Sequence, residues 1–277
     1  MKSLGWLLKN FFTHKDFIRE EVSAGLVPGT LFTPLHFIFS AIVLAIVIAC
    51  AVLLGRKKNK QAIKITFICI WVTTIVYEVA KILWETFAGS AVYFEAEGVL
   101  PLYPCSVFMY ALPFAIWGKG SVKQSACGYV CTIGFIGAAV NFFYPATILP
   151  NYSCISFAGF HTFFYHGSMM FCCIVMLVSG YHRYNRVKTW WQPFLAAIPL
   201  LIVSIPANIV NYSPIDADYM FFRCYRFDPF KTLLGGLDEW LTTVLFYIAY
   251  IIIPAAFYFP SFISQKIKLS KKQSDNI

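Results

Sequence analysis

The sequence has few charged residues. Only 13% of its 277 residues are Asp, Glu, Lys or Arg, whereas 59% are hydrophobic and 18% are aromatic. This is too little polar material to cover globular domains in water, so a soluble fold is excluded. Acidic residues are the scarcest, with 13 against 22 basic ones, and the basic residues stand in short runs between long apolar segments. That arrangement orients proteins in a membrane and argues against nucleic acid as the partner.

Three other patterns are missing. The nine cysteines include no CxxC pair and no ligand spacing with histidine, so we expect no metal site and no cofactor, and most of the cysteines should be small buried side chains. The N-terminal residues interleave Leu and Phe with Lys, which predicts an amphipathic helix on the membrane surface rather than a cleavable signal. No internal repeat is visible, which argues against the two-fold repeats of many transporters.

Long apolar stretches make up most of the sequence. Seven of them suit the roughly 20 residues that cross a hydrocarbon core about 30 Å thick. They run from 34 to 55, 63 to 89, 104 to 118, 125 to 144, 157 to 180, 190 to 211 and 237 to 259. We therefore predict an all-α polytopic membrane protein with about seven transmembrane helices. Its expected parts are an amphipathic interfacial segment (1–30), the seven-helix domain (31–260) and a basic cytoplasmic tail (261–277).

The basic residues between these stretches predict the orientation. Fourteen lie in the first, third and fifth linkers and the tail, seven lie in the other linkers and the N-terminal region, and Lys81 lies within the second stretch. The positive-inside rule places the fourteen in the cytoplasm. The N-terminus is then expected outside and the C-terminus inside, in a cell membrane that is most simply the bacterial plasma membrane.

The second stretch carries ionisable side chains. Thr74, Glu78, Lys81 and Glu85 recur at intervals of four, three and four, which places them on one face of a helix that must point into the bundle. Each ionisable group costs roughly 2.5 to 3.5 kcal/mol to insert. Two interpretations stay open: a neutralised structural stripe in which Lys81 pairs with Glu78 or Glu85, or a functional set.

The fifth stretch contains two histidines, His161 and His166. They lie about 140° apart around a helix, so we expect no shared metal ion. His166 is about 14 Å below the outer end of its helix, at a depth similar to that of Glu78, which suggests a proton-handling pair. Gly167 beside it would allow another chain or a ligand to approach the backbone. The alternative is that each histidine is a hydrogen-bonded packing residue.

Cys105 opens the third stretch at its predicted outer end. A thiol in the first turn of a helix is near the positive end of the helix dipole, which favours the nucleophilic thiolate; the alternative is an inert buried cysteine. A Cys154–Cys224 disulfide is a further option. A polar cavity is predicted in the outer half, above a floor formed by His166 and Glu78. Its other members are Cys105, His161, Glu85, Asn211, Asp218 and Asp238.

Three short motifs resemble the YwaF-type family of bacterial integral membrane proteins. The motifs are Leu100-Pro101-Leu102-Tyr103-Pro104-Cys105, Phe164-Tyr165-His166-Gly167, and Asn211-Tyr212 with Asp218-Tyr219-Met220-Phe221. That family is similar to the eukaryotic transmembrane (TMEM) acyltransferases, which move fatty acyl chains onto ether-linked phospholipids. The resemblance covers most of the chain, although this chain has Tyr103 where bacterial relatives often have His.

The resemblance implies a lipid acyltransferase in which Cys105 and His166 are the catalytic pair. Cys105 would take an acyl group from a phospholipid as a thioester, and a lysophospholipid hydroxyl would receive it, without ATP or coenzyme A. Water as the acceptor would make the protein a lipid hydrolase. The expected supporting or substrate-binding residues are Glu78, Lys81, Glu85, Tyr103, His161, Asn211, Asp218 and Tyr219.

Two other classes compete with this interpretation. A transporter or channel would use Glu78, Lys81, His166 and Asp218 to line an outer vestibule, since intramembrane charges mark ion and proton paths. A seven-helix receptor fits less well, because no lysine in the seventh stretch is available to hold retinal and the cytoplasmic linkers are short.

Overall fold

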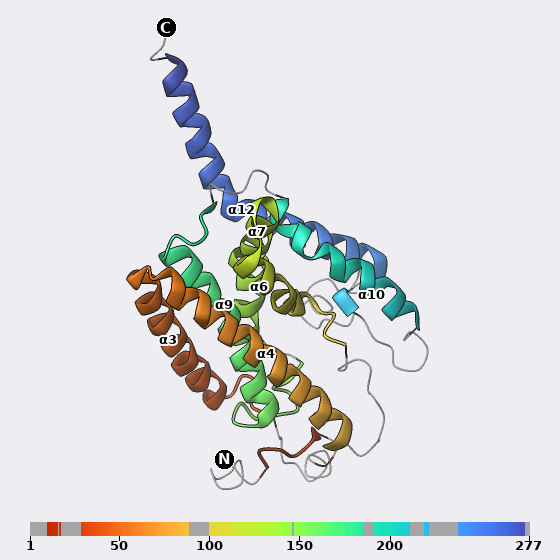
Figure 1. The fold of residues 1–277 in the computed structure, drawn as a ribbon. Helices are drawn as coiled ribbons and strands as arrows, with labels where there is room; N and C mark the ends of the chain where they lie inside the picture. Colours follow the sequence, from red (N-terminus) through yellow and green to blue (C-terminus); the bar gives the residue numbers. More distant parts are fainter. Residues whose placement is uncertain are drawn as a thin grey trace.

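The computed structural model describes residues 10–15, 17, 29–88, 100–145, 147–184, 191–210, 219–221 and 238–274. Within these ranges the regular elements are all helical (Figure 1). Most of the predicted amphipathic segment and the residues Asn211, Asp218 and Cys224 lie outside them. The all-α prediction is confirmed for the described part of the chain.

Two long helices, α3 (Pro34–Lys57) and α4 (Lys60–Ala88), account for the first two predicted stretches. Thr33 caps α3 by accepting a hydrogen bond from the His36 N–H, and Pro34 occupies the first turn, where a missing N–H costs little. Lys58 ends α3 in the left-handed conformation (φ 50°), and its N–H donates to the Gly55 carbonyl. The turn that reverses the chain into α4 is therefore built on Lys58.

The third stretch is a short helix. A 3₁₀ turn, η1 (Pro104–Ser106), continues into α6 (Val107–Trp117). The combined element, Pro104–Trp117, is about 21 Å long at 1.5 Å per residue, so it is shorter than the hydrocarbon core is thick.

The fourth stretch is one continuous helix of 24 residues, Gly120–Phe143. It consists of α7 (Gly120–Tyr129), a π-helical turn η2 (Val130–Gly134) and α8 (Phe135–Phe143). The fifth stretch is α9 (Phe157–Val178), which begins at Ser156, whose hydroxyl accepts from the Gly159 N–H. Helix α9 packs against α3, α4, α8 and η2, so it is the central element of the bundle (Figure 1).

The sixth and seventh stretches differ from prediction at their ends. The sixth is a 3₁₀ segment η4 (Gln192–Ala196) followed by α10 (Ile198–Val210), because Pro193 and Pro199 each suit a first turn and interrupt a single long helix. The short 3₁₀ turn η5 (Tyr219–Phe221) follows. Helix α12 (Glu239–Ser274) continues through the predicted tail, so that part of the tail is helical, and it projects beyond the bundle (Figure 1).

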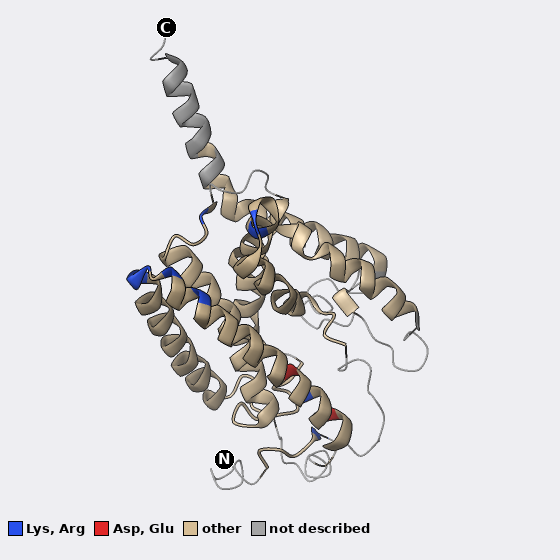
Figure 2. Ribbon diagram, viewed as in Figure 1, with Lys and Arg blue, Asp and Glu red and all other residues tan. Residues whose placement is uncertain are grey.

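In the described part of the chain, seven apolar helices match the seven predicted stretches. Five of these are long and apolar enough to cross a membrane, and the other two, Pro104–Trp117 and Ile198–Ile209, are shorter. Lys and Arg gather at the end of the bundle where α3 meets α4 and α7 begins, whereas the acidic residues of α4 lie toward its opposite end (Figure 2). The predicted orientation rests on this segregation and stays a prediction.

Candidate active site

The ionisable face of α4 points into the bundle. Thr74 is fully buried and Glu78 is 8% exposed. The Lys81 ammonium lies between two carboxylates, with Nζ 3.5 Å from Glu78 Oε1 and 3.8 Å from Glu85 Oε2. Both pairings that the spacing allowed are therefore formed. The arrangement pairs one ammonium with two carboxylates within two turns of one helix, which leaves one formal negative charge.

Glu78 also contacts α9. Its Oε2 lies 2.9 Å from Nε2 of His161, and the His161 ring packs edge-on against Tyr77 at 5.1 Å between centroids. The expected pairing of Glu78 with His166 is wrong. Both histidines lie at a depth similar to that of Glu78, but the rotation of α9 about its axis directs His161, rather than His166, toward α4. The second and fifth predicted stretches are thus joined by a carboxylate–imidazole contact.

His166 uses only one ring nitrogen. Its Nδ1 lies 2.8 Å from the carbonyl oxygen of Thr162, one turn earlier in α9. A carbonyl oxygen can only accept, so Nδ1 carries the proton and Nε2 of the neutral ring keeps its lone pair. The side chain is 7% exposed, and Nε2 has no hydrogen-bond partner among the described residues. His166 is therefore a buried acceptor held in one tautomer.

The backbone before Cys105 is fixed by hydrogen bonds from three directions. The Tyr129 hydroxyl donates to the Pro104 carbonyl at 2.6 Å, and Tyr250 lies 2.6 Å from the same hydroxyl. Because the single proton of Tyr129 is used by Pro104, Tyr250 must be the donor to Tyr129. The N–H of Met220 in η5 donates to the Leu102 carbonyl at 2.9 Å. Helices α7 and α12 and the turn η5 thus hold one short segment.

Cys105 is partly buried within this frame. The Tyr165 hydroxyl, from α9, donates to the Cys105 carbonyl at 3.4 Å. Glu78 and Lys81 both act electrostatically on the Cys105 thiol, with opposite signs. No hydrogen bond joins the two described residues Cys105 and His166, although Tyr165, which directly precedes His166 in α9, contacts the Cys105 segment. The structure therefore brings Cys105, Glu78, Lys81 and α9 into one region.

The predicted aromatic members of the site lie beside the Cys105 segment. Tyr103 immediately precedes Pro104, and its ring is 5.7 Å from that of Tyr219 in η5. Asn208 of α10 holds Tyr219 on both sides, since its side-chain amide donates to the Tyr219 carbonyl and accepts from the Tyr219 N–H. Asn211 and Asp218 lie outside the described residues, so their predicted roles stay predictions.

The structure also bears on three other predictions from the sequence, which concern Gly167, Cys154 and a metal site. Gly167 faces Val47 of α3, which a Cβ at this position would meet at 3.3 Å, so the close approach here is made by a neighbouring helix. Cys154 is a free, buried thiol, and burial raises its pKa, which makes it a poor nucleophile; its proposed partner Cys224 is not described. Within the described ranges, no three His, Cys, Asp or Glu side chains are grouped to hold a metal ion.

Three buried tyrosines around the Cys105 segment were not predicted from the sequence. Tyr129, Tyr165 and Tyr250 are buried, and each makes or supports a hydrogen bond to the backbone of the Cys105 segment. The available signal was a hydroxyl-bearing aromatic within an apolar stretch, which needs a hydrogen-bond partner when it is buried. The sequence contains sixteen tyrosines, however, and spacing alone does not say which of them meet.

Comparison with known proteins gives one family. Residues 31–260 match the model of the TMEM164 family, which covers most of the chain and nearly all of the helical bundle. A search of curated proteins and a search of solved structures each returned no match. The family match and the apolar helices together show a multi-pass membrane protein.

Proposed function

The chain belongs to the TMEM164 family of membrane proteins, and we propose that it is an acyltransferase that moves a fatty acyl group between phospholipids through a thioester on Cys105. The observation that carries the proposal is the free Nε2 of His166. A buried imidazole whose acceptor nitrogen has no partner is costly unless a substrate or a reacting group uses that nitrogen. A general base needs this protonation state.

The first half of the reaction forms the thioester. His166 Nε2 takes the Cys105 thiol proton, and the thiolate attacks the ester carbonyl carbon of a phospholipid. The carbon–oxygen bond to the glycerol then breaks, and the departing alkoxide takes the proton back from His166. A lysophospholipid leaves, and the acyl group remains on sulfur. Cys105 and His166 share no hydrogen bond in the described structure, and the proposal takes the bound substrate to complete the contact, since catalytic hydrogen bonds often tighten only in the complex.

The second half transfers the acyl group. The hydroxyl of a lysophospholipid gives its proton to His166 Nε2 and attacks the thioester carbonyl, and the carbon–sulfur bond breaks. Cys105 leaves as the thiolate and recovers the proton from His166. Electron pairs and protons balance without ATP or coenzyme A, because a thioester retains enough free energy to acylate an alcohol. Glu78 opposes the Cys105 thiolate more than Lys81 favours it, so the step depends on proton removal by His166.

The test is acyl exchange in liposomes with a labelled phospholipid donor and a lysophospholipid acceptor. Cys105→Ala should abolish transfer, and His166→Ala should lower it by about 10²- to 10⁴-fold, as for loss of a general base. Cys69→Ala is the matched control, since this thiol is exposed on α4. Full activity of purified Cys105→Ala protein would refute the proposal. Label released as free fatty acid rather than transferred would reassign the site to a hydrolase.

One observation favours a second function. Glu78 and Lys81 lie on the inner face of a membrane helix and His161 of α9 contacts Glu78, and buried ionisable groups of this kind often form ion or proton paths. Proton or ion flux into liposomes distinguishes this transporter from the enzyme. Flux that persists in Cys105→Ala and disappears in Glu78→Gln would favour transport. The pairing of Lys81 with both Glu78 and Glu85 supports a structural role for these charges over transport.

A further inference from the structure

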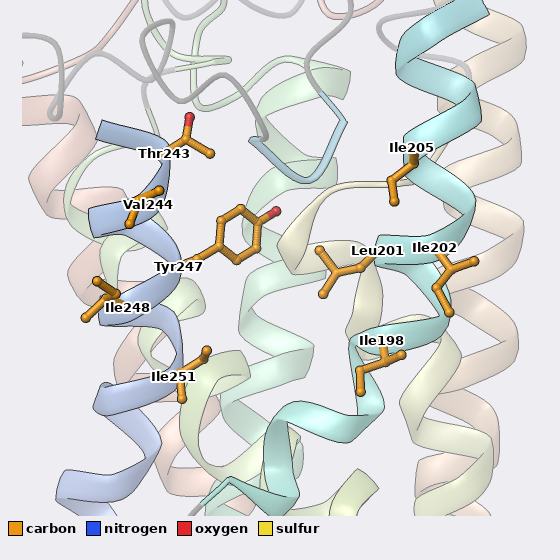
Figure 3. A pocket seen from close by; sticks show the side chains of 9 residues that line it. All are labelled: Ile198, Leu201, Ile202, Ile205, Thr243, Val244, Tyr247, Ile248 and Ile251. Atoms are coloured by element: carbon orange, nitrogen blue, oxygen red, sulfur yellow. The ribbon is translucent and has the colours of Figure 1, made fainter. Parts of the chain in front are cut away.

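The turn η5 connects α12 to the Cys105 segment through hydrogen bonds on both sides of one residue. Tyr247 points from α12 toward α10 (Figure 3), and its hydroxyl donates to the Met220 carbonyl at 2.7 Å. The Met220 N–H donates in turn to the Leu102 carbonyl at 2.9 Å, three residues before Cys105. The position of α12 is therefore transmitted through a single residue of η5 to the segment that carries the proposed nucleophile.

Met220 has a backbone conformation that a side chain disfavours. Its φ of 56° and ψ of 14° lie in the left-handed region, where the Cβ is crowded and glycine or asparagine is usual. The other two non-glycine residues with positive φ in the described part of the chain, Phe32 and Lys58, are exposed, whereas Met220 is 1% exposed. Such a conformation persists only where the surroundings hold it, and residues of this kind cluster at functional sites.

The surroundings that hold Met220 come from α10 as well as from α12. Asn208 of α10 donates to the Tyr219 carbonyl at 3.0 Å and accepts from the Tyr219 N–H at 2.8 Å. With the Tyr247 and Leu102 bonds, both N–H groups and both carbonyls of Tyr219 and Met220 are paired. The two helices thus fix η5 from one side, and η5 contacts the Cys105 segment on the other.

We infer that Tyr247 and Asn208 are positioning residues for acyl transfer, because they hold η5 in the conformation that fixes Leu102 and, through it, the Cys105 thiol. The inference rests on the proposed function, since it takes Cys105 as the nucleophile. Both residues act through η5 and not on the reacting atoms. A displacement of a nucleophile by about 1 Å can cost on the order of 100-fold in rate, so a hydrogen bond on the far side of η5 controls the chemical step.

Acyl exchange in liposomes tests the inference through the kinetic constants. Tyr247→Phe keeps the ring but frees the Met220 carbonyl, so kcat should fall by about 10- to 100-fold while KM for the phospholipid donor stays unchanged. Asn208→Ala should act in the same direction. Tyr181→Phe is the matched control, because it loses a hydrogen bond of the same 2.7 Å length to the Ala115 carbonyl. Equal kcat values for Tyr247→Phe and Tyr181→Phe overturn the inference.

Thiol alkylation gives a second readout, which does not depend on acyl transfer. A membrane-permeant maleimide is added to the full-length protein in liposomes, and the labelled cysteines are mapped by peptide mass spectrometry. Tyr247→Phe should speed the labelling of the partly buried Cys105 several-fold and leave the buried Cys127 and Cys131 at their slow rates. Faster labelling of all three thiols shows a general opening of the bundle and overturns the inference, as does an unchanged rate at Cys105.

The inference and the proposed function fail separately. Acyl exchange by the unsubstituted protein, with equal kcat values in Tyr247→Phe and Tyr181→Phe, supports the enzyme and overturns the positioning role. Absence of acyl exchange by the unsubstituted protein contradicts the proposed function. In that case selective labelling of Cys105 in Tyr247→Phe still supports the hold of η5 on this thiol, and uniform labelling overturns it.

Discussion

Two buried histidines, His36 and His166, differ in how their imidazole nitrogens are paired. His36 uses both nitrogens: Nε2 donates to the Phe142 carbonyl at 3.1 Å, and Nδ1 accepts from the Phe32 N–H at 3.3 Å. His166 uses one and keeps the other free. Since buried polar atoms are nearly always paired, the single free acceptor distinguishes His166 from His36.

Tyr129→Phe tests whether the frame around Cys105 matters. The variant removes the hydroxyl that holds the Pro104 carbonyl, so it should slow acyl transfer while costing about 1 to 3 kcal/mol of stability. Tyr181→Phe is the matched control, because Tyr181 makes the equivalent bond to the Ala115 carbonyl near the other end of α6. Transfer rates compared at equal thermal stability decide the point. Equal acyl-transfer rates in the two variants would show that the Tyr129 hydroxyl does not position Cys105.

Glu78→Gln tests the charge network. The substitution keeps the size and shape of the side chain but replaces the carboxylate that Lys81 and His161 share with a neutral amide. The free energy of unfolding should therefore fall by about 3 kcal/mol. Glu85→Gln should cost less, because Glu85 is more exposed and makes the longer contact. Thermal unfolding in detergent measures both. A larger loss from Glu85→Gln would contradict the assignment of Glu78 as the central acid.

At the scale of single residues, the sequence predicted part of the candidate site. Spacing placed Glu78, Lys81 and Glu85 on one inner face, and both possible Lys81 pairs are formed. Depth alone could not choose between His161 and His166 as the partner of Glu78, since the choice depends on how α9 is rotated against α4. The hydrogen bond between Tyr129 and Tyr250 joins residues 121 positions apart, which no local pattern encodes.

At the scale of elements, apolar length predicted all seven helices but not their ends. A run of hydrophobic residues does not show where a proline starts a new turn, which is why the sixth stretch is divided into η4 and α10. It also does not show the π-helical turn η2, whose widened backbone lies directly after Tyr129. Both departures shape the surroundings of the Cys105 segment.

Helix contacts at small residues give the next prediction. A Cβ on Gly55 of α3 would lie 2.9 Å from the Val178 side chain of α9, and Val is stiff, so Gly55→Ala should destabilise the bundle by about 1 to 3 kcal/mol. Gly137→Ala is the control: its added methyl meets open space and should be neutral or stabilising, since Ala is the better helix former. Melting temperatures in detergent compare the two. Equal shifts would contradict the close packing of α3 on α9.

The whole molecule has a polarity along the bundle axis. The basic turn between α3 and α4 lies at one end, with the start of α7 and the end of α9, and Lys123 there sits 4.4 Å above the Tyr181 ring (Figure 2). The Glu78 cluster lies in the half of α4 nearer its other end. The positive-inside rule predicts that the basic end is cytoplasmic, so the proposed active site opens toward the outer leaflet.

Engineered cysteines test this orientation. Thr147→Cys lies in the connection between α8 and α9, and Lys60→Cys lies at the start of α4; both original side chains are exposed. A membrane-impermeant thiol reagent added to intact cells should label Thr147→Cys above the unsubstituted background and leave Lys60→Cys at background. The opposite order would invert the topology while leaving the helical bundle unchanged.

The central claim is that Cys105 carries an acyl group as a thioester, and intact mass spectrometry tests it most directly. After incubation with a defined phospholipid, the protein should gain the mass of one fatty acid minus one water, and hydroxylamine should remove the added group. The adduct should map to Cys105 and be absent from Cys105→Ala. No adduct on any cysteine, with labelled phospholipid shown to be present and accessible to the protein, would contradict the account.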